Sequence, residues 1–235
     1  KEQWFQAVFY LVLGFALKPT MVVLLLLLWG LYRPLWWRLP LGLFAVLIFP
    51  FFTQEPHYVI AQYLGSIDML QIASTVGSNN TDWAQIFGLL AQLKLMPTQL
   101  FQDLIRVIVA IFVFYSGVLV KQKFNKNHAA IFLYALATIY LMLFNPRTEG
   151  NDYGIVAPAI GVFISLFLAC DFKKQMWLLV FTIGGLIMSG NLTFIMGSGD
   201  REFWSAPFFA LVFAIIVIVQ IFIPSMFLQN QNNFS

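Results

Sequence analysis

A dense group of polar side chains interrupts an otherwise apolar stretch at residues 145–153, which read NPRTEGNDY. This polar island holds three charged groups, two Asn amides and one Tyr hydroxyl. Pro146 ends the preceding helix and Gly150 permits a tight turn, so the side chains can converge at a membrane surface. Because such groups are unfavourable at membrane depth, the island predicts a binding site; a polar connector is the alternative.

Lys18 is a second ionisable group in an apolar setting. Pro19 disrupts backbone hydrogen bonding beside it, so residues 4–32 form either one kinked helix or a hairpin. A cation on the same side as Arg147 would suit an anionic lipid phosphate. The alternative is a side chain that extends to the surface from the tip of the hairpin.

Composition indicates the elements that must position these groups. Hydrophobic residues make up 60% of the 235 residues and charged residues only 10%. A soluble domain carries about a quarter charged residues, so the sequence predicts an all-α, polytopic membrane helix bundle. The basic residues lie in short loops, a pattern that orients a membrane protein and does not indicate a nucleic-acid partner. The single Cys170 excludes an internal disulfide and a multi-cysteine metal site.

The apolar segments predict one transmembrane domain over residues 1–228, followed by a polar tail at 229–235. Four of the segments reach the length of about 17 residues that is needed to span a bilayer: 100–120, 154–170, 175–196 and 203–224. The shorter segments are 4–17, 19–32, 39–53 and 129–144.

Charge asymmetry predicts the topology. If the six segments from 39–53 to 203–224 each cross once, three basic loops fall on one side, which the positive-inside rule makes cytoplasmic. The polar island, the turn around Arg201 and the long stretch 54–99 then face outward. We expect that stretch to form short amphipathic helices on the membrane or a cap over the bundle. Asp103 and Arg106, spaced i,i+3 at the outward end of 100–120, are expected to pair.

Several of these elements resemble glycosyltransferase family 87 of the GT-C superfamily. The polar island followed by APA carries the resemblance, as do LKPT and a later YRPLWWR, and a looser SNNT contributes less. Their positions are 145–153 with 157–159, 17–20, 32–38 and 78–81. The resemblance implies a GT-C-like helix bundle that transfers a sugar, often mannose, from a polyprenyl-phosphate donor to a lipid or glycan acceptor at the outer membrane face.

The resemblance also implies roles for particular residues. Sugar transfer needs cations to stabilise the leaving phosphate and a base for the acceptor hydroxyl, and it needs no metal or cofactor here. Arg147, with Lys18 or Arg201, would bind the phosphate. Asn151 and Tyr153 offer neutral hydrogen bonds to the sugar, and Glu149 can orient Arg147 or accept from a sugar hydroxyl. The candidate bases are Asp82, Glu149 and Asp152.

The chain departs from the family at its start. GT-C enzymes carry an acidic residue, usually the catalytic base, in the first outward loop, whereas only three residues precede the first apolar run here. We therefore expect a C-terminal portion that holds the donor half of the site, in a bacterial inner or plasma membrane. The alternatives are a transporter or flippase of a lipid-linked or anionic substrate, with Lys18 beside a broken helix, and a non-catalytic membrane subunit.

Overall fold

The computed structural model describes residues 3–75, 84–145, 148–169, 173–195 and 205–223. These residues form α- and 3-10 helices and no strand, which confirms the all-α expectation. The chain divides into two compact units, Lys1–Ser78 and Asn79–Ser235. Their internal contacts define the fold of each unit, and the single transmembrane domain over 1–228 stays a prediction.

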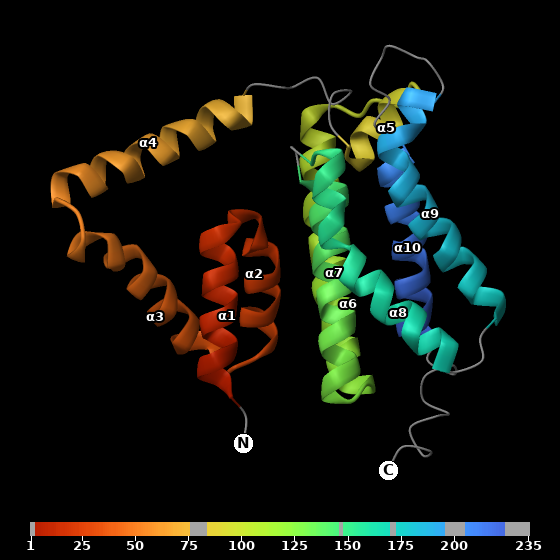
Figure 1. Cartoon of the computed structure of the whole chain (residues 1–235), viewed down its shortest axis with the longest axis horizontal. Coiled ribbons are helices and arrows are strands. Elements are labelled where there is room, and N and C mark those ends of the chain that lie inside the picture. The colour runs from red at the N-terminus through yellow and green to blue at the C-terminus, as the bar shows by residue number, and fades with distance from the viewer. Residues whose placement is uncertain (1–2, 76–83, 146–147, 170–172, 196–204, 224–235) are drawn as a thin grey trace. The chain divides into compact units, whose positions relative to one another are not determined.

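Unit 1 opens with a helical hairpin, which decides between the two forms predicted for residues 4–32. Lys18 is extended (φ −141°, ψ 97°) and ends the first helix, and Pro19 begins a single 3-10 turn. The ring of Trp4, at the start of the first helix, lies 5.7 Å from the ring of Tyr32, which follows the second. The two helices are therefore antiparallel (Figure 1). The elements of the hairpin are α1 (Trp4–Leu17), η1 (Pro19–Met21) and α2 (Val22–Leu31).

The rest of unit 1 packs on this hairpin and then leaves it. Helix α3 (Leu35–Ile48) buries Leu35 and Leu39 against Val8 and Val12 of α1 and Leu25 of α2. The 3-10 turn η2 (Phe49–Phe52), which contains Pro50, ends α3 and leads into α4 (Pro56–Thr75).

Where the predicted outward stretch 54–99 is described, it forms one long helix and one short helix. Helix α4 has 20 residues and belongs to unit 1, whereas α5 (Ile86–Gln92) has seven and belongs to unit 2. The Tyr63 hydroxyl donates to the Leu47 carbonyl at 2.7 Å and ties α4 to α3. Exposed apolar side chains occur on several sides of α4, so it is not sharply amphipathic. A position of this stretch on the outer membrane surface stays a prediction.

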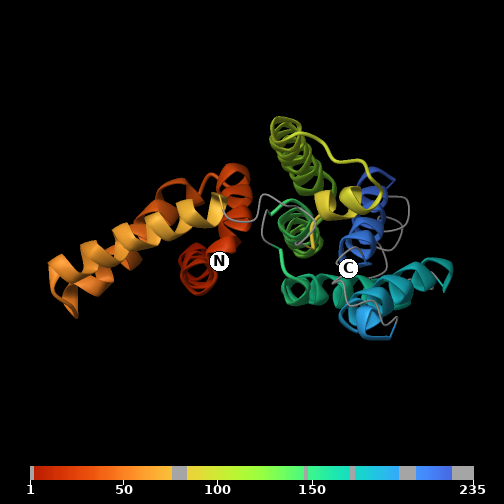
Figure 2. The same ribbon diagram turned by 90° about the horizontal axis from the view of Figure 1, so that it is seen from above.

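Unit 2 is built around α7 (Lys126–Phe144), the helix with the most buried residues in the described part of the chain. The Asn125 side chain caps its start by accepting the His128 N–H at 2.9 Å. Figure 2 shows α7 between its neighbours in a view from above. Phe132 of α7 packs edge-on against Phe163 at 5.2 Å, and Phe163 packs likewise against Phe213 at 5.5 Å. The other elements are α6 (Gln99–Lys123), η4 (Gly150–Ile155), α8 (Ala157–Ala169), α9 (Lys173–Ile195) and α10 (Ser205–Phe222).

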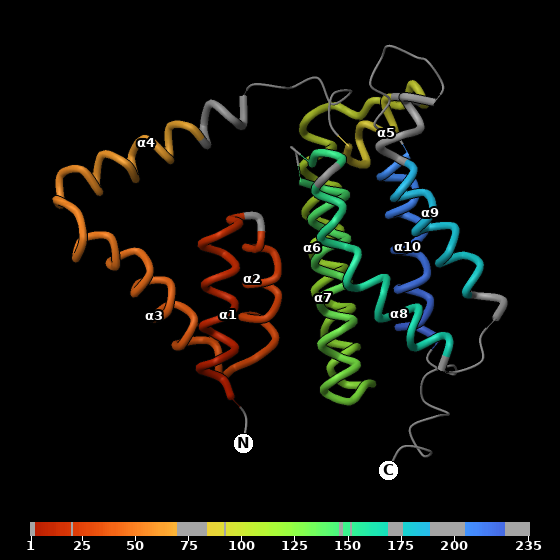
Figure 3. The backbone as a smooth tube through the Cα atoms, in the orientation of Figure 1, coloured from red at the N-terminus to blue at the C-terminus, as the bar shows by residue number. Residues whose placement is uncertain are grey.

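From α6 to α10 the helices of unit 2 alternate in direction, as the tube in Figure 3 shows. The Lys123 ammonium at the end of α6 donates to the Ile221 carbonyl near the end of α10 at 3.3 Å. The polar island follows the opposite end of α7. This alternation is what the predicted topology requires of unit 2, and the orientation of the unit in a membrane stays a prediction.

Within the described residues, four helical segments are long and apolar enough to cross a membrane: Leu35–Phe52, Gln99–Lys123, Lys126–Phe144 and Ser205–Phe222. They indicate a membrane protein. The helices at 100–120 and 203–224 exceed the ~17 residues needed to span a bilayer. Those at 39–53 and 129–144 are longer than expected because each begins earlier than its apolar run.

The predicted segment at 154–170 begins its α-helix later than expected. Residues 150–155 form the 3-10 turn η4, so α8 begins only at Ala157, and its 13 described residues rise ~20 Å. The segment at 175–196 forms most of the 23-residue α9, whose apolar described part covers Met176–Met188.

Candidate functional site

The polar island leaves α7 through an extended residue. Asn145 ends the helix with φ −68° and ψ 128°. The proline that follows disfavours the helical conformation at this position, which accounts for the end of the helix. The Thr148 hydroxyl, in a fully buried side chain, donates back to the Asn145 carbonyl at 3.2 Å. The island therefore folds back on the end of α7.

A reciprocal pair of hydrogen bonds begins the 3-10 turn η4. The Glu149 side chain accepts a backbone N–H of the turn, and Asp152 Oδ2 accepts the Glu149 N–H at 3.1 Å. This is a capping box, in which two side chains satisfy backbone donors that the turn leaves free. Both candidate carboxylates thus shape the turn, and Glu149 remains exposed to solvent.

Tyr153 joins the island to the residues before α5. Its side chain is buried, and its hydroxyl donates to the Ala84 carbonyl at 2.8 Å. The Ala84 N–H in turn donates to the Thr148 carbonyl at 2.8 Å. Burial, and then the nearby charge of Asp152, raise the pKa of Tyr153, so the phenol is neutral at physiological pH. The one donor of Tyr153 is used within the protein, which makes it a structural anchor of the island.

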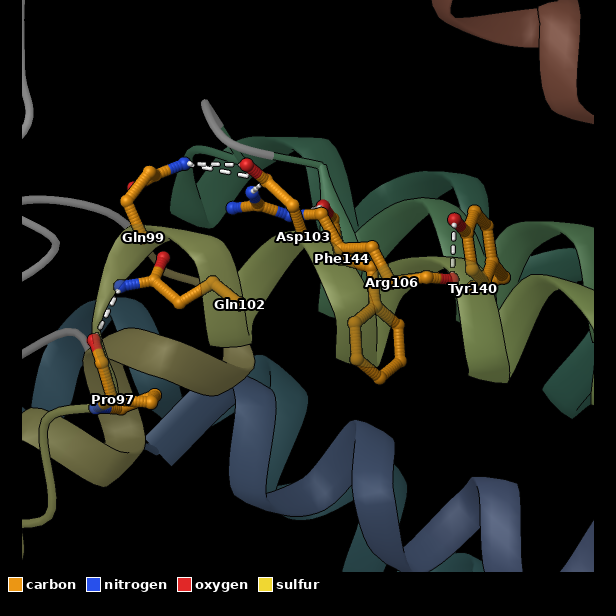
Figure 4. Close-up of polar contacts among 7 residues, drawn as sticks. All are labelled: Pro97, Gln99, Gln102, Asp103, Arg106, Tyr140 and Phe144. Carbon is orange, nitrogen blue, oxygen red and sulfur yellow. Dashed lines mark hydrogen bonds and ion pairs between the residues drawn. The ribbon is translucent and has the colours of Figure 1, made fainter.

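Arg106 connects α6 to the end of α7 (Figure 4). Its NH1 contacts Asp103 Oδ1 at 2.6 Å, which confirms the predicted i,i+3 pair. Its Nε donates to the Phe144 carbonyl at 3.2 Å, one residue before the island begins. Its guanidinium lies 5.0 Å from the centre of the Phe87 ring. The Tyr140 hydroxyl of α7 donates to the Arg106 carbonyl at 3.2 Å, so the two helices are held together in both directions.

Two glutamines complete this group at the start of α6. Gln99 Nε2 donates to Asp103 Oδ1 at 3.3 Å, so Arg106 and Gln99 together hold the exposed carboxylate (Figure 4). Gln102 is buried and donates to the Pro97 carbonyl at 3.1 Å, while its Oε1 has no hydrogen-bond partner among the described residues. The sequence interpretation did not include either glutamine. The sequence signal that could have identified them is the repeat of polar residues at i, i+3 and i+4 at the start of an apolar helix.

The structure places only part of the predicted site. Glu149, Asp152 and Tyr153 lie within one turn, and the Asn151 backbone lies in the same turn, although its side chain is outside the described residues. Lys18 is half-buried in unit 1, so its predicted convergence with the island of unit 2 stays a prediction. The remaining predicted residues lie outside the described ones: Asp82, Arg147 and Arg201.

Where side chains are described, no three His, Cys, Asp or Glu residues group as metal ligands would. The expected reaction without a cofactor stays a prediction. The described groups offer hydrogen-bond chemistry: an exposed carboxylate at Asp103, another at Glu149, and a guanidinium at Arg106 that is only 15% exposed.

No family model matches the chain, and no curated protein or solved structure matches it either. The resemblance to glycosyltransferase family 87 therefore stays a prediction that rests on the motifs of the sequence.

Proposed function

We propose that the chain is a membrane glycosyltransferase, or the donor-binding portion of one, that uses a polyprenyl-phosphate sugar at the outer membrane face. One observation supports this best. The polar island is anchored at two of its residues: Thr148 bonds to Asn145 at the end of α7, and Tyr153 bonds to Ala84. Side chains between such anchors are preorganised, and preorganisation is what recognition of a transferred group requires.

The proposed roles derive from the chemistry of the groups. Arg147 directly precedes Thr148 in the sequence and would bind the donor phosphate with its planar fork, aided by Lys18 or Arg201. Glu149 is exposed, and its carboxylate keeps accepting capacity beyond the backbone N–H that it caps, so it would accept from a sugar hydroxyl. Asn151 would add neutral hydrogen bonds. Asp82 and Asp152 are the remaining candidate bases.

A non-catalytic membrane subunit is the second candidate. The internal use of the Tyr153 hydroxyl and of the Asp152 carboxylate supports it, because both groups already stabilise the fold. The transporter interpretation receives less support. It relied on a broken spanning helix beside Lys18, and residues 4–32 form a hairpin of two short helices instead.

The test is the affinity of the purified full chain for a polyprenyl-phosphate mannose. Replacing Arg147 by Ala should weaken binding by about 2–5 kcal/mol if a charged partner is left buried. Arg147→Lys keeps the charge and loses the fork, so it should fall between the parent and the Ala variant. Lys173→Ala, at the predicted cytoplasmic side, is the control and should bind as the parent does. If Arg147→Ala retains full affinity, the island is structural and the second candidate is favoured.

A further inference from the structure

Unit 1 has an open apolar groove between α1 and α3, with a volume of about 300 Å³. Its lining contains no charged side chain. The facing walls include Phe5, Val8, Val12 and Ala16 on α1, and Gly42 and Ala45 on α3.

The two helices that line the groove approach each other closely at Gly42. A Cβ atom added at Gly42 would lie 2.8 Å from Cγ1 of Val8 and 3.1 Å from Cγ2 of Val12. Phe5 meets Trp37 five residues earlier on α3, with ring centres 6.0 Å apart. Contacts therefore advance along both helices in the same direction, and α1 and α3 are parallel. The groove runs lengthwise between them.

Arg38 lies at the Phe5 end of the groove. Its guanidinium carbon is 5.1 Å from the centre of the Phe5 ring and 4.5 Å from that of Trp37. One terminal nitrogen donates to the Pro34 carbonyl at 2.7 Å. Its Nε has no hydrogen-bond partner among the described residues. That Nε is buried, but a guanidinium has five N–H donors, so terminal N–H groups beyond the one accepted by Pro34 are the ones an anion would contact.

The dimensions match one leaflet of a bilayer. Phe5 and Ala16 are 11 residues apart on α1, which corresponds to ~17 Å. Half of a hydrocarbon core of about 30 Å is ~15 Å. Trp36 and Trp37 are both exposed beside Arg38, as expected of aromatic residues at the membrane interface. The Arg38 end would then lie at headgroup level and the rest of the groove at the depth of the acyl chains.

We propose that the α1–α3 groove binds an acyl chain of an anionic phospholipid whose phosphate contacts Arg38. The positive-inside rule places Arg38 in the cytoplasmic leaflet, where anionic lipids are concentrated. This proposal does not depend on the proposed glycosyltransferase function. The apolar walls take the chain, and the arginine selects the charge of the headgroup.

The headgroup experiment compares two lipids with the same acyl chains, phosphatidylglycerol and phosphatidylcholine, on the purified full chain in detergent. Native mass spectrometry measures the lipid retained. The parent should prefer phosphatidylglycerol by about fivefold, and Arg38→Gln should abolish that preference. Arg38→Lys should keep most of it. The matched control is Arg33→Gln, an identical loss of charge at an exposed residue in the turn before α3, which should keep the preference. No preference in the parent, or an equal loss in both Gln variants, overturns the proposal.

A second experiment fills the groove with a larger side chain. Ala45→Phe adds a ring to the groove wall and should reduce the retention of both lipids. Leu41→Phe adds bulk to an exposed position of α3 outside the groove and should leave retention unchanged. Circular dichroism and gel filtration establish that each variant is folded. If Ala45→Phe binds both lipids as the parent does, or changes only the oligomeric state, no acyl chain occupies the groove and the proposal fails.

Discussion

At the scale of single residues, Tyr153 is the clearest link between the island and the fold. Tyr153→Phe removes the hydroxyl and leaves the buried Ala84 carbonyl without its donor, which should destabilise the protein by about 1–3 kcal/mol. The measurement is thermal or chemical unfolding of the full chain in detergent. Tyr115→Phe is the control, because Tyr115 is exposed on α6, and its effect should stay within about 0.5 kcal/mol.

The stabilisation from the Tyr153 hydrogen bond to Ala84 should depend on pH, and its direction follows from the raised pKa of Tyr153. The folded state raises the pKa of Tyr153, so the folded protein keeps a neutral phenol where the unfolded chain ionises, above about pH 10. The contribution of Tyr153 is therefore complete below that pH and falls as the pH rises above it. The stability difference between the parent and Tyr153→Phe should shrink above pH ~10. A constant difference would contradict the buried phenol.

Arg106 makes two contacts of different kinds, and substitutions separate them. Its bond to the Phe144 carbonyl is partly buried, whereas its partner Asp103 is 59% exposed. Asp103→Asn should cost only about 0.2–1 kcal/mol, as exposed ion pairs do. Arg106→Gln also removes the donor of the Phe144 carbonyl and should cost about 1–3 kcal/mol in the same unfolding assay. Equal effects would show that the ion pair, and not the α6–α7 connection, is the contribution of Arg106.

At the scale of elements, the approach of α1 to α3 depends on Gly42. Gly42→Ala places a Cβ within 2.8 Å of Val8 and should destabilise the protein by about 1–3 kcal/mol through overpacking. Gly14→Ala is a matched control in α1, where nothing lies within 4 Å of an added Cβ. It should stabilise by about 0.5–1 kcal/mol. Val8→Ala in the Gly42→Ala background should restore part of the loss, and its failure to do so would place the conflict elsewhere.

Apolar runs predict most of the helices, because a helix that is buried or spans a membrane leaves a recognisable run of apolar residues. The choice between a kinked helix and a hairpin depends instead on contacts between residues that are distant in the sequence. Both a kinked helix and a hairpin satisfy Pro19, and the packing of Trp4 on Tyr32 decides between them. The start of α8 depends on the 3-10 turn before it, which the apolar run does not reveal.

The candidate site shows the same division between local and distant contacts. The Asp103–Arg106 pair is local in sequence, so its spacing predicts it. The bond from Arg106 to Phe144 crosses 38 residues, and that from Tyr153 to Ala84 crosses 69. Sequence spacing does not reveal such contacts. The hydrogen bonds that anchor the island can therefore be identified only from the folded structure.

At the scale of the whole molecule, the ends of unit 2 differ in charge. Lys121 and Lys123 lie in the last turn of α6 and Lys126 begins α7, while the polar island follows the other end of α7. The helix that begins at Lys173 follows α8, whose direction is opposite to that of α7 (Figure 3). The positive-inside rule then predicts that the lysine end is cytoplasmic and that the island faces outward.

Cysteine labelling tests this orientation directly. With Cys170 replaced by Ser, Gly150→Cys and Ser198→Cys should react with a membrane-impermeant thiol reagent in intact cells, because both positions are predicted to face outward. Asn125→Cys, between α6 and α7, should react only after the cells are permeabilised. As a control for accessibility to the reagent, all three cysteines should be labelled equally after permeabilisation. The reverse pattern would place the island in the cytoplasm, where a donor presented at the outer face cannot reach it, and would move Arg38 and its proposed lipid to the outer leaflet.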